Sequence, residues 1–208
     1  MTRILLVPGS IGEATLHTAA LRTAARFAPE GITATLYDGL RELPAFVPGE
    51  PSGAVTDLRR RVAAADAVLF STPEYAGSLP GSLKNLLDWL VDGGQLHGKP
   101  VAWLSLAAPG RDDGARATLE TVLGHANARL LQPVCMRFPL APEAVDPQGI
   151  VTDPRLPMAL LDMLQSLARS LAAPQAAPAP SWQAYSSVYP VIVPRPASPS
   201  VHTWRPPS

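Results

Sequence analysis

The chain has 208 residues, enough for one ordinary domain with a hydrophobic core, and 47% of them are apolar. Its 17 basic and 17 acidic side chains give a net charge of zero. This balance argues against a general nucleic-acid binder and against a strongly acidic electron carrier. The single cysteine, Cys135, excludes an internal disulfide and a cysteine-built zinc site. We expect it to be a buried thiol in a reducing compartment.

No run reaches the roughly 18 consecutive apolar residues that a membrane-spanning helix needs. The first apolar run, residues 4–7, is too short for the core of a signal peptide, and Pro8-Gly9 stops it. These features predict a cytoplasmic protein that contacts neither a membrane nor nucleic acid.

Five short apolar runs alternate with five longer segments of helical periodicity. The short runs predict strands at residues 4–7, 32–37, 67–70, 101–106 and 134–138. The periodic segments predict helices at residues 15–27, 55–65, 82–91, 115–130 and 157–171. Regular alternation of strand and helix predicts an α/β fold, a three-layer sandwich with a parallel sheet between two layers of helices.

The character of the individual strands indicates their order in the sheet. Residues 4–7 and 67–70 are apolar at every position, as in strands that are buried on both faces. Residues 32–37 alternate between apolar and polar side chains, which favours an edge position. An edge second strand fits the flavodoxin-like order 2-1-3-4-5 better than the Rossmann order, in which that strand is internal. We therefore predict a flavodoxin-like, five-stranded parallel sheet.

The composition changes after the last predicted helix. Residues 174–208 contain nine prolines and no aspartate, glutamate or lysine. This composition predicts a domain at residues 1–172 and a Pro-rich, disordered tail at 173–208. The tail also contains two tryptophans and two tyrosines, so the alternative that residues 188–193 lie in a groove or on a partner subunit stays open.

Three loops are expected to form the functional site. In an open α/β sheet, ligands bind beyond the carboxyl ends of the strands, where the strand order reverses. For order 2-1-3-4-5 this point lies between the first and third strands. We call the three segments that meet there the first loop (residues 8–15), the second loop (72–82) and the third loop (106–114).

The first loop reads PGSIGEAT and has the features of an anion site. Its glycines permit a tight turn with exposed amides, Ser10 and Thr15 add hydroxyl groups, and a helix begins near Thr15. Phosphate is the most natural ligand, although a plain turn before a helix remains an equal alternative. The glycine spacing matches neither the dinucleotide-binding fingerprint nor the Walker A loop.

The second loop reads TPEYAGSLPGS and can present backbone groups beside a planar heterocycle. Pro73 restricts its backbone, Gly77 frees it, and Tyr75 offers a flat ring. Glu74 could instead act as a general base, but the spacing shows no partner for it. The third loop, LAAPGRDDG, is small and flexible, which suits either the close approach of a ring system or a plain surface turn.

The stretch TPEYAGSLPGSLKNLLDWL, residues 72–90, resembles the NADPH-dependent FMN reductase family, a flavodoxin-like group that includes chromate and quinone reductases. Members carry Pro-Glu-Tyr-Asn or Pro-Glu-Tyr-Ala/Gly, followed by Pro-Gly-x-Leu-Lys-Asn-x-x-Asp-Trp. The Gly9-Ser10 turn and the Pro109-Gly110 loop also resemble the corresponding turns of this family. The resemblance covers about residues 3–171.

The resemblance implies a bound FMN, with NADPH or NADH as the co-substrate that delivers a hydride. The reduced flavin then passes its electrons in a ping-pong reaction to a small acceptor, such as a quinone, an azo compound, a metal oxyanion or free flavin. It implies a homodimer or homotetramer, to which Trp89 could contribute, the alternative being that Trp89 packs within its own subunit. No catalytic acid or base and no metal ligand is expected.

The resemblance also implies which residues contact FMN. Its phosphate would be bound by Ser10, Thr15 and His17. Its isoalloxazine ring would be held, largely through backbone groups, by residues of the second and third loops: Pro73, Glu74, Tyr75, Ala76, Gly77, Ser105, Ala108 and Gly110.

The first loop departs from the family pattern. Many relatives read Gly-Ser-x-Arg-x-x-Ser-x-Asn, whereas this chain has Gly12 in place of the arginine, Thr15 in place of the serine and His17 in place of the asparagine. A charge-assisted hydrogen bond contributes about 1.5–3 kcal/mol, so we expect weaker FMN retention, offset in part if His17 is protonated. Two alternatives therefore stay open: a flavin-free binding protein with a flavodoxin fold, and an FMN electron carrier.

Overall fold

The structure is a computed structural model that describes residues 1–12, 15–146 and 149–172. The tail predicted at residues 173–208, and with it the segment 188–193, lies outside the described residues. None of the described helices is long and apolar enough to span a membrane.

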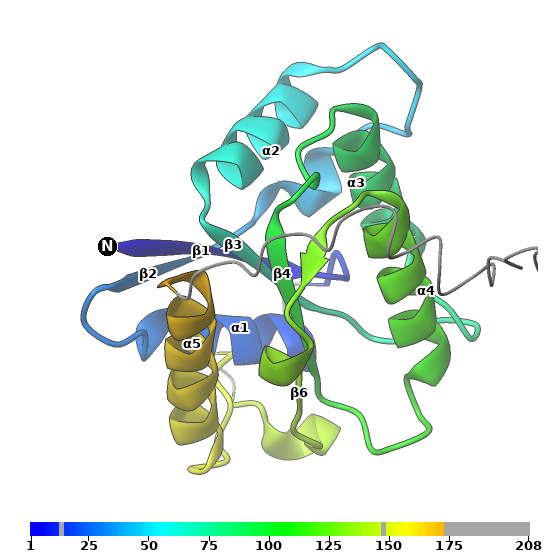
Figure 1. The fold of residues 1–208 in the computed structure, drawn as a ribbon. Helices are drawn as coiled ribbons and strands as arrows, with labels where there is room; N and C mark the ends of the chain where they lie inside the picture. The colour runs from blue at the N-terminus through cyan, green and yellow to red at the C-terminus, as the bar shows by residue number, and fades with distance from the viewer. Residues whose placement is uncertain (13–14, 147–148, 173–208) are drawn as a thin grey trace, which may run out of the picture. The chain divides into compact units, whose positions relative to one another are not determined.

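The described chain forms a parallel sheet in the predicted order (Figure 1). The strands β1 (Thr2–Pro8), β2 (Ile32–Leu36), β3 (Ala67–Ser71), β4 (Pro100–Ser105) and β5 (Arg129–Leu130) follow the order β2-β1-β3-β4-β5. Every adjacent pair is parallel, and among the described residues β2 pairs with β1 alone. The predicted order 2-1-3-4-5 and the edge position of the second strand are confirmed.

The fifth predicted strand differs from the structure. Instead of one strand at residues 134–138, two short strands, β5 and β6 (Met136–Arg137), both pair with β4. The 3-10 helix η2 (Gln132–Val134) separates them. Pro133 lies within this turn and has no N–H to donate to a strand ladder, so the sheet cannot continue through it.

Helices cover both faces of the sheet, as predicted. Helices α1 (Leu16–Arg26) and α5 (Leu156–Ala172) pack on one face, below the sheet in Figure 1. Helices α2 (Gly53–Ala64), α3 (Gly81–Asp92) and α4 (Asp113–His125) pack on the other. The short 3-10 helices η1 (Gly39–Glu42) and η3 (Pro142–Ala144) lie in connecting segments. Helix α4 ends five residues before its predicted end because Asn127 adopts a left-handed φ of 52°.

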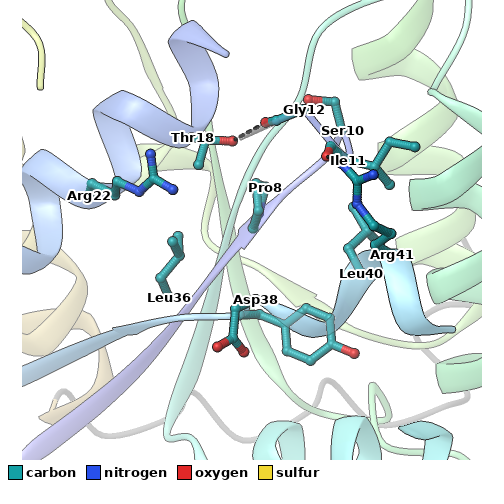
Figure 2. A pocket seen from close by; sticks show the side chains of 11 residues that line it. Pro8, Ser10, Ile11, Gly12, Thr18, Arg22, Leu36, Asp38, Leu40 and Arg41 are labelled. Carbon is teal, nitrogen blue, oxygen red and sulfur yellow. Dashed lines mark hydrogen bonds between the residues drawn. The ribbon is translucent and has the colours of Figure 1, made fainter. Parts of the chain in front are cut away.

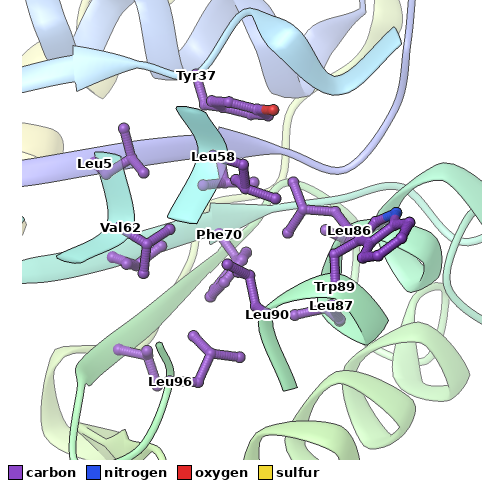
Figure 3. Close-up of a cluster of buried hydrophobic side chains, with 14 of the residues drawn as sticks. Leu5, Tyr37, Leu58, Val62, Phe70, Leu86, Leu87, Trp89, Leu90 and Leu96 are labelled. Atoms are coloured by element: carbon purple, nitrogen blue, oxygen red, sulfur yellow. The ribbon is translucent and has the colours of Figure 1, made fainter. Parts of the chain in front are cut away.

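The central strands supply side chains to two separate hydrophobic clusters. Leu5 of β1 and Phe70 of β3 pack against α2 and α3 (Figure 3), whereas their neighbours Leu6 and Leu69 pack against α1 and α5. Because successive side chains of a strand point to opposite faces, both faces must be apolar. This explains the uninterrupted apolar runs in the sequence.

Trp89 belongs to the first of these clusters. Its side chain is 1% exposed, its ring meets the ring of Phe46 edge-on with centroids 4.9 Å apart, and its Nε1 donates to the carbonyl of Pro44 at 3.0 Å. Arg59 lies over the same ring at 6.0 Å. Trp89 therefore packs within its own subunit, which decides between the two alternatives left open by the sequence.

The ends of β1 and β3 approach each other closely at Gly9. The amide of Gly9 donates to the carbonyl of Ser71 at 2.8 Å. A Cβ atom at this position would lie only 2.8 Å from Cα of Thr72 and would also overlap the Thr72 side chain. Glycine is therefore required where the first and second loops begin.

We predict that Gly9→Ala lowers the free energy of unfolding by about 1–3 kcal/mol, because the backbone at Thr72 must move to admit the methyl group. Urea unfolding of the purified protein measures this change. The matched control is Gly53→Ala at the first residue of α2, where a Cβ atom would meet nothing within 4 Å. Equal stabilities of the two variants would contradict the prediction.

Candidate functional site

The three loops lie side by side at the carboxyl ends of β1, β3 and β4. The Ser82 hydroxyl donates to the carbonyl of Gly9 at 3.3 Å, which joins the second loop to the first. The Glu74 carboxylate accepts from the amide of Ala115 at 2.9 Å, which joins the second loop to the start of α4 beyond the third. The predicted grouping of the loops is therefore present.

The described part of the first loop presents hydroxyl groups around the start of α1. Thr15 is the N-cap residue of this helix and accepts from the amide of Thr18 at 3.2 Å. Its hydroxyl also lies 2.9 Å from that of Thr18 and 3.4 Å from that of Ser10. Ser10 and Thr15, predicted as phosphate ligands, are thus close together, and Thr18, which was not predicted, joins them.

A cavity of about 140 Å³ opens beside this loop, towards the carboxyl end of β2 (Figure 2). Its walls include Ser10, Ile11 and Gly12 of the loop and two arginines, Arg22 of α1 and Arg41 of η1. Arg41 donates from its guanidinium group to the carbonyl of Ile11 at 2.8 Å. The site therefore has arginines nearby although Gly12 itself carries no charge.

His17, the third predicted phosphate ligand, is buried and bonded to the sheet instead. Its Nδ1 lies 2.9 Å from Oγ of Ser71, and the Ser71 hydroxyl donates its proton to the carbonyl of Leu104 at 2.8 Å. Ser71 must then accept from His17, which places the ring proton on Nδ1. Burial lowers the pKa of His17 to about 4, with a smaller opposing effect of Asp112. Burial therefore favours neutral His17 at neutral pH in the protein without ligand, and compensation by a protonated His17 beside a bound phosphate stays a prediction.

The second loop contains a tight turn with an exposed tip. The backbones of Tyr75 and Ser78 exchange two hydrogen bonds, of 2.9 and 3.0 Å, and Ala76 and Gly77 between them have φ values of 51° and 73°. Positive φ at both central positions is the geometry of a type I′ turn. Tyr75, Ala76 and Gly77 are exposed, so their backbone groups and the Tyr75 ring are available to a ligand.

Glu74 holds this turn in place. In addition to its bond to Ala115, its carboxylate lies at the positive end of the α4 dipole, which stabilises a negative charge there. Gly114 permits the contact: a Cβ atom at this position would lie 2.9 Å from the carbonyl carbon of Gly77 and 3.1 Å from the Glu74 carboxylate. The carboxylate therefore has a structural partner, which favours the predicted ring-holding role over the alternative of a general base.

The third loop has an exposed turn and a buried polar base. Ala108 accepts from the amide of Arg111 at 3.1 Å, Gly110 has a φ of 82°, and both Ala108 and Gly110 are exposed. Ser105 is 3% exposed, and its hydroxyl donates to the buried carboxylate of Asp112. Ser105 thus supports the loop from below rather than presenting its side chain to a ligand.

The carboxylate of Asp112 also forms an ion pair with the guanidinium group of Arg137 in β6, with Oδ1 and Nη2 2.9 Å apart. Neither residue is indicated by the sequence, because a pair of aspartates before a helix is a common surface pattern and Arg137 lies 25 residues further on. Asp112 occupies the N-cap position of α4 but makes no side-chain cap hydrogen bond, since its carboxylate bonds Ser105 and Arg137 instead.

This arrangement fits FMN by its donor chemistry. The first loop offers hydroxyls, a helix N-terminus and nearby guanidinium groups, which suit a phosphate. The second and third loops offer exposed backbone at the tips of two fixed turns, which suits a flat heterocycle. At Gly9 and Gly114 the surrounding backbone leaves no room for a Cβ atom, and at Gly12 a Cβ atom would lie 2.7 Å from Cγ2 of Thr15.

Comparison with known proteins agrees with this chemistry. Residues 2–136 match the profile of the family described as NADPH-dependent FMN reductase. An NAD(P)H-dependent FMN reductase of Pseudomonas aeruginosa is 33% identical over 173 residues, which cover 79% of this chain and 92% of the relative. A quinone reductase of Escherichia coli is 28% identical over 162 residues, or 73% of this chain and 85% of the relative.

A solved structure confirms the fold. The flavoenzyme NAD(P)H:(acceptor) oxidoreductase FerB from Paracoccus denitrificans superposes with a TM-score of 0.69, at 24% identity, over 83% of this chain and 98% of that one. The predictions of a flavodoxin-like fold, of an oxidoreductase, and of FMN with NADPH or NADH are confirmed: the chain belongs to the NADPH-dependent FMN reductase family.

Proposed function

We propose that this protein binds FMN across its three loops and uses NADPH or NADH to reduce a small acceptor, a quinone or an azo compound. The observation that carries the proposal is the pair of exposed turns, at residues 75–78 and 108–111, fixed beside the hydroxyl-lined first loop. Named relatives favour these acceptors: besides the quinone reductase, an NADPH azoreductase of a Bacillus species is 40% identical over 95 residues, or 43% of this chain and 52% of the relative.

In this proposal the hydroxyls of Ser10, Thr15 and Thr18 and the N-terminus of α1 bind the phosphate. The backbone of Tyr75, Ala76 and Gly77 lies against one part of the ring, and the turn from Ala108 to Gly110 lies near its other edge. Pro73 and Glu74 keep the second loop in position, and Ser105 does the same for the third. His17 orders the base of the site through Ser71.

FMN, when bound, supplies the hydride and electron chemistry of the reaction. The protein then has to position the flavin and exclude water. It also has to leave one face of the flavin ring open, first for NAD(P)H and then for the acceptor. Cys135 is no nucleophile in this scheme, because burial raises the pKa of its thiol to about 11.

We also propose a cytoplasmic homodimer or homotetramer. The support is the exposure of two apolar side chains beside the site, Ile11 at 48% and Tyr75 at 54%, which a second subunit would cover. Sedimentation equilibrium tests this assembly, and a monomer at micromolar concentration would contradict it.

The visible absorption spectrum of the purified protein tests the main proposal. After FMN is added and the sample is desalted, we expect flavin bands that bleach with NADPH and return with a quinone. Gly114→Ala should lose these bands, because its methyl group displaces the second loop. Gly124→Ala in the same helix should keep them, since a Cβ atom there meets nothing within 4 Å. A protein that binds no flavin would favour the flavin-free alternative, and flavin that NADPH fails to bleach would favour the electron carrier.

The buried His17 predicts a pH dependence of stability. Its pKa of about 4 lies below the usual 6.5, so the unfolded chain takes up a proton at a higher pH than the folded protein. Stability should therefore fall as the pH is lowered from 6.5 towards 4, by at most about 3 kcal/mol from this residue. In urea unfolding, His17→Asn should reduce the dependence of the free energy of unfolding on pH, whereas His97→Asn, at an exposed histidine, should leave that dependence as in the wild type. An equal pH dependence for wild type and His17→Asn would refute the prediction.

The turn in the second loop predicts a stabilising substitution. Ala76 has a φ of 51°, which costs a residue with a Cβ atom about 1–2 kcal/mol, whereas asparagine tolerates this conformation better. Ala76→Asn should raise the free energy of unfolding by about 0.5–1 kcal/mol. Asn127 has nearly the same φ, 52°, so Asn127→Ala should lower it by a similar amount. Thermal unfolding measures both, and changes of the same sign would be inconsistent with the argument.

A further inference from the structure

The first loop contains no arginine or lysine, yet the structure places an arginine against it. Arg41 comes from η1, after β2, and its guanidinium group donates to the carbonyl of Ile11 at 2.8 Å. Ile11 directly precedes Gly12, the position of the missing arginine. Figure 2 shows the guanidinium group beside Ile11, on the side of the cavity opposite Arg22.

The charge of Arg41 is not neutralised by a carboxylate in the described part of the chain. The bond to Ile11 is its one hydrogen bond there, and a guanidinium group has five N–H donors. Asp38 is the acidic residue that lines the same cavity, and it pairs with Arg61 at 3.1 Å. Arg41 therefore has donors and charge left for a ligand.

We propose that Arg41 binds the phosphate of FMN and takes over the role of the arginine missing at Gly12. This inference rests on the proposed function. The bond to Ile11 holds the guanidinium group against the loop that is proposed to bind the phosphate, so little conformational entropy would be lost on binding. Guanidinium and phosphate form charge-assisted hydrogen bonds that neutral donors cannot replace.

The consequence is a selectivity that can be measured without turnover. Riboflavin carries the same ring as FMN but no phosphate, so Arg41 should favour FMN and leave riboflavin unaffected. Since Arg41 is exposed, the preference should weaken as salt is added.

The experiment is a titration of the flavin-free protein with FMN and with riboflavin, followed by quenching of flavin fluorescence. We expect Arg41→Gln to raise the Kd for FMN about fivefold to tenfold at low salt and to change the Kd for riboflavin less than about twofold. Arg41→Lys keeps the positive charge but loses the planar guanidinium group, so its Kd for FMN should lie between those of the wild type and Arg41→Gln. Arg60→Gln, at another exposed arginine, on α2, is the matched control and should leave both constants unchanged.

If Arg41→Gln lost equal affinity for FMN and for riboflavin, Arg41 would only maintain the shape of the loop, and the inference would be overturned. An unchanged Kd for FMN would also overturn it, as would a preference of the wild type for FMN that is insensitive to salt. The salt series needs no variant, so a preference that salt does not change would overturn the inference even if Arg41→Gln is unstable. If the wild type binds neither flavin, the proposed function itself fails, which is a different result from the loss of selectivity.

Discussion

The parallel pairing of β1 with β3 is the constraint on which the site depends. Residues Ile4 to Pro8 pair in register with Ala67 to Ser71, so both strands end at the same height and their loops emerge together. Since a parallel sheet must bury both faces, the two strands are apolar over residues 4–7 and 67–70, and their polar side chains lie at the strand ends. At that point the absence of a side chain at Gly9 lets the first loop lie against Thr72.

Below the loops, a buried polar layer connects helices to strands. One part runs from His17 through Ser71 to Leu104, and the other joins Ser105, Asp112 and Arg137. Buried polar groups are costly unless they are satisfied, and within this layer each group has a partner. The layer ties α1, β3, β4, α4 and β6 together directly under the site, so the loops above it rest on a fixed base.

The sequence was most informative where periodicity and motif agreed. The apolar runs at residues 4–7 and 67–70 and the alternation at 32–37 gave the strand order, and the stretch at 72–90 indicated the family. It was least informative about contacts between distant residues. The role of Glu74 as a cap depends on α4, 41 residues away, and the approach of Arg41 to Ile11 spans 30 residues. Such contacts are set by the packing of the fold, and no local pattern indicates them. The split of the fifth strand has a local reason: Arg129–Leu130 falls in the segment whose periodicity predicts the helix at residues 115–130, so no separate strand is indicated there.

The second loop has a broader consequence for how this family diversifies. Its turn is held by backbone hydrogen bonds between Tyr75 and Ser78 and by the carboxylate of Glu74, while the side chains of Tyr75 and Ala76 are free at the surface. In the proposed site the cofactor contacts main-chain groups of this turn, so these contacts leave the side chain of Tyr75 unconstrained, whereas the φ of 51° restricts the residue at position 76. If FMN binds as proposed, substitutions of Tyr75 would change which acceptor is admitted without rebuilding the cofactor site. One scaffold could in this way give rise to reductases with different substrates.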